Sequence, residues 1–117
     1  WFSIAIVVFC SSACERMPRR CRVQTGIDST EPRAALMYLQ SHSYSCNERE
    51  REISCVSSGN IVHEVHLWPL EVNWRMQVLI HVKRSDPCPW SELTTIAKTI
   101  RSGWRPGVPT VMELVGR

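Results

Sequence analysis

The sequence predicts an α+β fold, a two-layer sandwich with the order helix, strand, strand, helix, strand over residues 46–117. Two neighbouring segments, 61–70 and 74–83, are rich in β-branched and aromatic residues, and their apolar and polar side chains roughly alternate, as in strands. Residues 91–103 instead repeat apolar side chains at the three- and four-residue spacing of a helix that covers a sheet. We therefore expect both helices on one sheet face, with the other face open to solvent or a partner.

Each predicted element has a local signal. The charged segment 46–56 contains residues that favour a helix, and Asn47 can cap its start. The first strand stops at Pro69, because proline cannot donate a ladder hydrogen bond. The second helix ends before Pro106, and the alternating residues 109–115 predict a short last strand.

Composition limits the classes of protein to which the chain can belong. Its 117 residues are 44% hydrophobic and 21% charged, which is typical of one globular domain and excludes both wholesale disorder and a protein with many membrane spans. The net charge is +3 and basic residues are spread evenly along the chain, so we expect no nucleic-acid partner. No nucleophile elbow, phosphate-binding glycine loop or H-E-x-x-H motif occurs, and the sequence therefore indicates no enzyme.

The first 45 residues divide into an apolar segment and a polar one. Residues 1–14 are almost wholly apolar but too few to cross a bilayer, which takes about 20 residues. We interpret them as the remnant of a transmembrane helix in a fragmentary chain, with the arginines that follow on the cytoplasmic side. A signal-peptide remnant and a buried strand are the alternatives. Residues 15–45 contain turn and connector residues and are predicted to be an irregular linker.

The chain has six cysteines, and no two of them have C-x-x-C spacing. That spacing is typical of zinc knuckles and redox sites, so neither is indicated. We expect scattered reduced thiols, as in a cytosolic domain. The alternative is a small secreted interaction protein held by three disulfides, because an even number of cysteines in a short chain is typical of such proteins.

Imidazole and carboxylate side chains gather on the predicted strands. His63, Glu64 and His66 belong to the first strand, His81 to the second and Glu113 to the last. Histidine nitrogen and glutamate oxygen are normal zinc ligands. Residues three apart on a strand point to opposite faces, so one metal is not expected to take both His63 and His66. The register that decides which of them faces His81 stays open. The alternative is that these histidines are ordinary surface or interface residues, as histidines on strands more often are.

The segment 61–68, with the letters IVHEVHLW, resembles the V-H-D-L-H-V-W signature of the cation diffusion facilitator family of zinc-efflux transporters. Four further segments are similar to elements of that family's C-terminal domain, in the same order: 48–56, 78–83, 92–101 and 110–113. The resemblance covers about residues 46–115. Glu64 in place of Asp and the early Pro69 depart from the family pattern.

The resemblance implies a metallochaperone-like (ferredoxin-like) αββαβ domain in the cytosol, which forms a homodimer and senses Zn²⁺ as part of a divalent-cation efflux transporter in a membrane. Carried over by position, the implied metal ligands are His63, His81 and Glu113, and more weakly His66 and Glu64. Trp68 is implied at the interface. The family's transport site lies on transmembrane helices that this chain does not contain, so we expect no transport by the chain alone. A truncated or degenerate gene product without activity is the remaining alternative.

Overall fold

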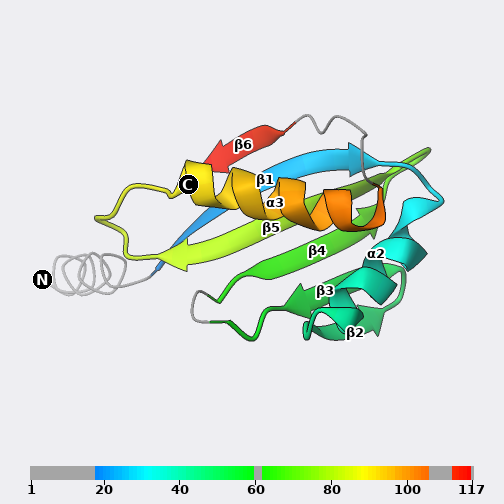
Figure 1. Ribbon diagram of the computed structural model, residues 1–117. Helices are drawn as coiled ribbons and strands as arrows, with labels where there is room; N and C mark the ends of the chain where they lie inside the picture. The colour runs from blue at the N-terminus through cyan, green and yellow to red at the C-terminus, as the bar shows by residue number, and fades with distance from the viewer. Residues whose placement is uncertain (1–17, 60–61, 106–111, 117) are drawn as a thin grey trace, which may run out of the picture.

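The computed structural model describes residues 18–59, 62–105 and 112–116. They form one antiparallel sheet with the strand order β2-β3-β4-β5-β1-β6 and two helices (Figure 1). Along the chain the elements are β1 (Arg19–Ile27), α2 (Glu31–Ser41), β2 (Ser45–Arg49), β3 (Glu52–Val56), β4 (Glu64–Pro69), β5 (Trp74–Val82), α3 (Trp90–Trp104) and β6 (Glu113–Gly116).

The predicted αββαβ ferredoxin-like sandwich is wrong, because the described residues form an antiparallel six-stranded sheet with two helices. Part of the difference lies in residues 15–45, which were expected to be irregular but contain β1 and α2. β1 is a central strand that pairs with β5 along its whole length, from Arg19 opposite Val82 to Ile27 opposite Trp74. The first helix of the domain was predicted at residues 46–56. In the structure the first described helix is α2, which lies between β1 and β2.

β1 has a clear strand pattern despite its three arginines. Its inward side chains, Cys21, Val23, Thr25 and Ile27, are buried, and the residues between them are more exposed. This period of two is typical of a strand with one covered face. Pro32 is compatible with α2 because it lies at the helix start, where its missing N–H is not needed.

The helix predicted over 46–56 is also wrong, because these residues form the hairpin of β2 and β3. Their Glu and Arg residues favour a helix locally, but Ile53 and Cys55 alternate inward and are buried, and burial in the tertiary structure overrides propensity. A disulfide joins Cys46 to Cys55, nine residues away, with the Cα atoms 4.0 Å apart. In a helix, that separation would place them about 13.5 Å apart along the axis.

The predicted pair of strands and the predicted second helix are confirmed as β4, β5 and α3. β4 and β5 are antiparallel, with Glu64 opposite Leu79 and His66 opposite Gln77. β6 pairs with β1 rather than with either of them. Part of the segment predicted as the last strand, residues 109–111, lies outside the described residues.

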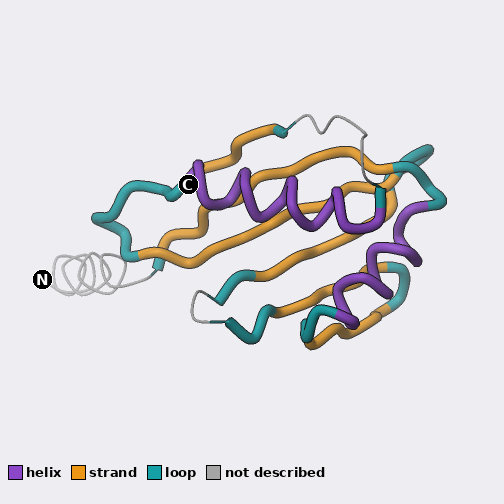
Figure 2. The backbone as a smooth tube through the Cα atoms, viewed as in Figure 1, coloured by secondary structure: helices purple, strands orange, loops and turns teal. Residues whose placement is uncertain are grey.

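Both helices pack on the same face of the sheet, where the core lies (Figure 2). Leu39 of α2 and Leu93 of α3 are fully buried against inward side chains such as Val65 of β4 and Val78 of β5. Each such side chain stabilises the fold by about 1.5–3 kcal/mol. No described helix covers the opposite face of the sheet, which we call the open face.

A second disulfide joins Cys21 of β1 to Cys88, in the loop before α3, across a separation of 67 residues. The Cα atoms are 5.6 Å apart, and both cysteines are buried. The structure thus pairs four of the six cysteines, which differs from the expectation of reduced thiols. Cys10 and Cys14 lie outside the described residues.

A buried ion pair ties the start of α2 to the end of α3. The Glu31 carboxylate accepts hydrogen bonds from Arg101 Nε at 3.2 Å, Trp104 Nε1 at 3.0 Å and the backbone N–H of Asp28 at 2.5 Å. Burial alone would raise the pKa of the Glu31 carboxyl, but these hydrogen bonds and the Arg101 charge lower it below its ordinary value. Removing Glu31 would leave the Arg101 charge buried without compensation.

The segment 1–14, interpreted above as a transmembrane remnant, lies outside the described residues. In the part of the chain that the structure describes, neither helix is long and apolar enough to cross a membrane.

Candidate functional site: the open face of the sheet

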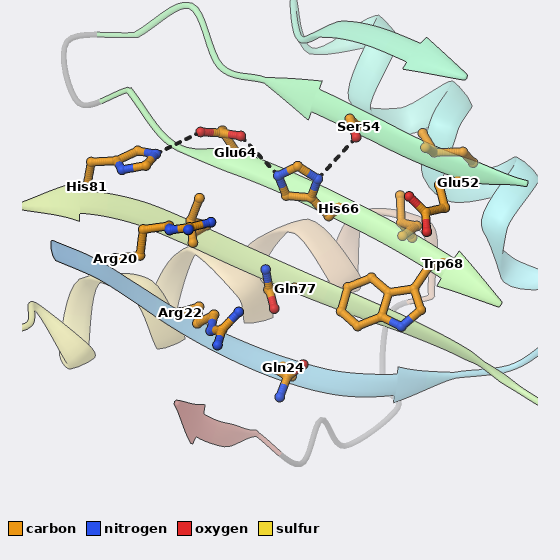
Figure 3. Close-up of a pocket in the computed structure, with 13 residues that line it drawn as sticks. Arg20, Arg22, Gln24, Glu52, Ser54, Glu64, His66, Trp68, Gln77 and His81 are labelled. Atoms are coloured by element: carbon orange, nitrogen blue, oxygen red, sulfur yellow. Dashed lines mark hydrogen bonds and ion pairs between the residues drawn. The ribbon is translucent and has the colours of Figure 1, made fainter. Parts of the chain in front are cut away.

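The open face is hollowed over its four central strands. The hollow has a volume of about 480 Å³. Figure 3 shows the residues that line it. Its polar lining comes from alternate positions on neighbouring strands: Arg20, Arg22 and Gln24 on β1, Gln77 and His81 on β5, Glu64, His66 and Trp68 on β4, and Glu52 and Ser54 on β3. The antiparallel register places these side chains in rows across the sheet, because residues directly opposite each other share a face.

A chain of hydrogen bonds runs along one side of the hollow. His81 Nε2 lies 3.1 Å from Glu64 Oε2, His66 Nε2 lies 3.0 Å from Glu64 Oε1, and His66 Nδ1 lies 3.1 Å from Ser54 Oγ (Figure 3). An ionised carboxylate only accepts hydrogen bonds, so both Nε2 atoms donate to Glu64. In a neutral His66, Nδ1 then accepts the hydrogen bond of the Ser54 hydroxyl.

The carboxylate at the middle of this chain is held in its ionised form. Partial burial would raise the pKa of Glu64, but the hydrogen bonds and charges of His66 and His81 outweigh that effect and lower the pKa. The Glu64 side chain is 29% exposed and that of His81 is 46% exposed. The group is therefore within reach of a ligand from solvent.

The structure brings together three of the five predicted metal ligands, Glu64, His66 and His81. His63 lies elsewhere: its Nε2 is 2.5 Å from Tyr44 Oη, and its side chain lines another hollow together with residues of α2 and α3. Glu113 is on edge strand β6, where it accepts a hydrogen bond from Arg75 at 3.3 Å. The predicted ligand set of His63, His81 and Glu113 is thus spread over separate places.

The donor types around Glu64 suit zinc, but their arrangement is linear. Each imidazole Nε2 is hydrogen-bonded to a different carboxylate oxygen, so a metal would have to replace these hydrogen bonds. Over residues 18–59, 62–105 and 112–116, no group of three or more His, Cys, Asp or Glu side chains is placed to hold a metal ion.

Sequence reasoning missed Arg20, Arg22 and Ser54, because they lie in segments predicted as linker and helix. The pattern that could have identified them is the alternation of polar and apolar residues in β1 and β3. Cys21 and Ile53, their neighbours in sequence, point inward and are buried. Trp68, predicted at an interface, is half-buried on β4 and lines the hollow. Its place at a dimer interface stays a prediction.

No protein-family model and no curated protein matches the chain. The resemblance to the cation diffusion facilitator family therefore stays a prediction.

Proposed function

We propose that this chain is a small disulfide-bonded interaction protein of an oxidising compartment, which binds its partner on the open face of the sheet. The observation that supports this most is the pairing of Cys21 with Cys88 and of Cys46 with Cys55. Disulfides persist in secreted and cell-surface proteins and are rare in the cytosol.

The contrast between the two faces supports the choice of binding surface. One face is covered by α2 and α3 and buries apolar side chains, whereas the other exposes charged, amide and aromatic groups around a hollow. A partner on the open face would leave the core and both disulfides undisturbed. No catalytic step is proposed.

The test is a count of free thiols in the denatured chain purified without reductant. The proposal expects at most two of the six cysteines to react with an alkylating reagent, because four are paired. Peptide mapping should then recover one cross-linked peptide pair containing Cys21 and Cys88 and another containing Cys46 and Cys55. A sample reduced before alkylation provides the control, in which all six react. Six reactive thiols in the unreduced sample would refute the proposal.

A zinc-responsive regulatory domain of a cation-efflux protein is a second candidate, as the sequence resemblance implies. The observation that favours it is that His66, Glu64 and His81 lie together and offer the nitrogen and oxygen donors that zinc takes. The two candidates differ in compartment, because a cytosolic domain keeps its cysteines reduced.

The second candidate is tested by sedimentation and calorimetry with and without Zn²⁺. It expects a zinc-promoted homodimer that is weakened by His81→Ala and His66→Ala and left unchanged by His42→Ala, just after the end of α2. His63→Ala distinguishes the implied ligand set from the observed group, because His63 contacts Tyr44 instead. A monomer that does not respond to zinc would contradict this candidate.

A further inference from the structure

Arg20 and Arg22, on β1, are arginines of the open face without acidic partners among the described residues. The side chains of Arg20 and Arg22 form no ion pair with another described residue, and the fully buried Nε of Arg22 has no hydrogen-bond acceptor there. Because this Nε is enclosed by the protein, a ligand would meet the guanidinium at its Nη groups. No acidic side chain of the described residues neutralises either guanidinium, so an anion bound there would meet uncompensated positive charge.

The acids on either side of these arginines are already engaged. Glu113, opposite Gln24 on the neighbouring strand β6, accepts a hydrogen bond from Arg75. Glu64, on β4, is engaged as well. Its two oxygens accept hydrogen bonds from His66 and His81. It is also remote from β1, because β5 lies between β4 and β1 and each strand-to-strand step is about 4.8 Å. Leu79 stands between Glu64 and Arg22 in the same cross-strand row.

The spacing of the two arginines suits one oxyanion. Arg20 and Arg22 are two residues apart on one strand, so their Cα atoms are about 6.8 Å apart and their side chains leave the same face. Two guanidinium groups at this separation can converge on a single carboxylate or phosphate and form charge-assisted hydrogen bonds. The row beside them offers the amides of Gln24 and Gln77, which are opposite each other in the register.

We propose that Arg20 and Arg22 form an oxyanion site on the open face, and that the partner places a carboxylate or phosphate group there. This inference rests on the proposed use of that face for binding. It adds the chemical class of the group that is bound, and it does not depend on metal.

The experiment is a titration of the oxidised, ¹⁵N-labelled full chain with inorganic phosphate and, separately, with acetate, at constant ionic strength. The Arg22 Nε–H resonance should shift and saturate. Arg22→Gln and Arg20→Gln should each weaken the affinity by about tenfold, since each removes charge-assisted hydrogen bonds. Arg33→Gln, an exposed arginine on α2, should leave the affinity unchanged.

The two titrations identify which type of oxyanion the site prefers. Tighter binding of phosphate indicates a phosphorylated ligand, and tighter binding of acetate indicates a carboxylate ligand. A shift that does not saturate with either anion, or an equal loss in Arg33→Gln, would overturn the proposal. Amide spectra of each variant confirm that it remains folded. The thiol count does not depend on anions, so the oxyanion site can fail while the disulfide-bonded module stands.

Discussion

Glu31 and Glu64 are both carboxylates that accept hydrogen bonds on each oxygen, but they lie in opposite surroundings. Glu31 is 4% exposed and is held by Arg101, Trp104 and the backbone of Asp28. Glu64 is 29% exposed and is shared by two histidines at the edge of a hollow. A carboxylate of the same chemistry is therefore structural where the chain encloses it, and accessible to a ligand where the chain leaves it open.

The largest effect on stability is expected at Glu31. Glu31→Gln removes the charge that compensates buried Arg101, so the free energy of unfolding should fall by about 3–5 kcal/mol. Urea denaturation measures this change. Glu48→Gln, on the exposed edge strand β2, is the control and should change it by less than about 0.5 kcal/mol. Equal effects of the two substitutions would show that the buried pair is not structural.

The two disulfides also differ in the length of chain that they close into a loop. Replacing Cys21 and Cys88 with alanine should lower the free energy of unfolding by about 4 kcal/mol, as expected for a separation of 67 residues. Replacing Cys46 and Cys55 should lower it by about 2.5 kcal/mol, because the closed loop spans only nine. Chemical denaturation of the two double variants measures the order. The reverse order would contradict the assignment of the long cross-link as the stronger constraint.

The pH dependence of stability should separate the two carboxylates further. The folded-state pKa values of Glu31 and Glu64 are both lowered, so their contributions are present above the unfolded pKa of about 4.3 and are lost as the pH falls through the lower folded values. The gap in unfolding free energy between the native chain and Glu31→Gln should therefore narrow below about pH 4.3. The gap for Glu64→Gln should narrow by less, because solvent screens that site. Denaturation series from pH 7 to pH 3 measure both gaps, and a constant gap for Glu31→Gln would contradict the lowered pKa.

The smallest effect on stability is expected at Glu64 itself. Glu64→Gln should change the free energy of unfolding by less than about 1 kcal/mol, as for other exposed pairs. It should nevertheless alter the imidazole ¹⁵N shifts of His66 and His81, because both rings lose the carboxylate that fixes Nε2–H as the donor. The ring of His42, which contacts Tyr38, serves as the internal control. Unchanged shifts at His66 and His81 would break the proposed hydrogen-bond chain.

The sequence predicted the parts of the fold that local pattern determines. β4, β5 and α3 follow from clear periods of two and 3.6, because one face of each contacts the core. The hairpin of β2 and β3 could not be predicted in this way. Its charged residues favour a helix, and the burial of Ile53 and the bond between Cys46 and Cys55 become visible only in three dimensions.

The candidate site was predicted in part. Glu64, His66 and His81 were identified by residue type, but their grouping depends on a register that puts Glu64 opposite Leu79, and sequence alone leaves that register open. Arg20 and Arg22 were missed because three arginines in 19–22 look like a solvated connector rather than part of a central strand. Their role depends on the pairing of β1 with β5, which joins distant parts of the chain.

The disulfide between Cys21 and Cys88 also shortens the covalent path between β1 and β5. Arg19 and Val82 are opposite each other although 63 residues (82 − 19) separate them along the chain. Through the disulfide, the path runs two residues from Arg19 to Cys21 and six from Cys88 back to Val82. Bringing distant segments together costs entropy that grows with the length of the intervening loop, and folding is slower when native contacts are remote in sequence. The oxidised chain thus assembles its central strand pair as a local event, whereas the reduced chain must assemble it across more than half its length.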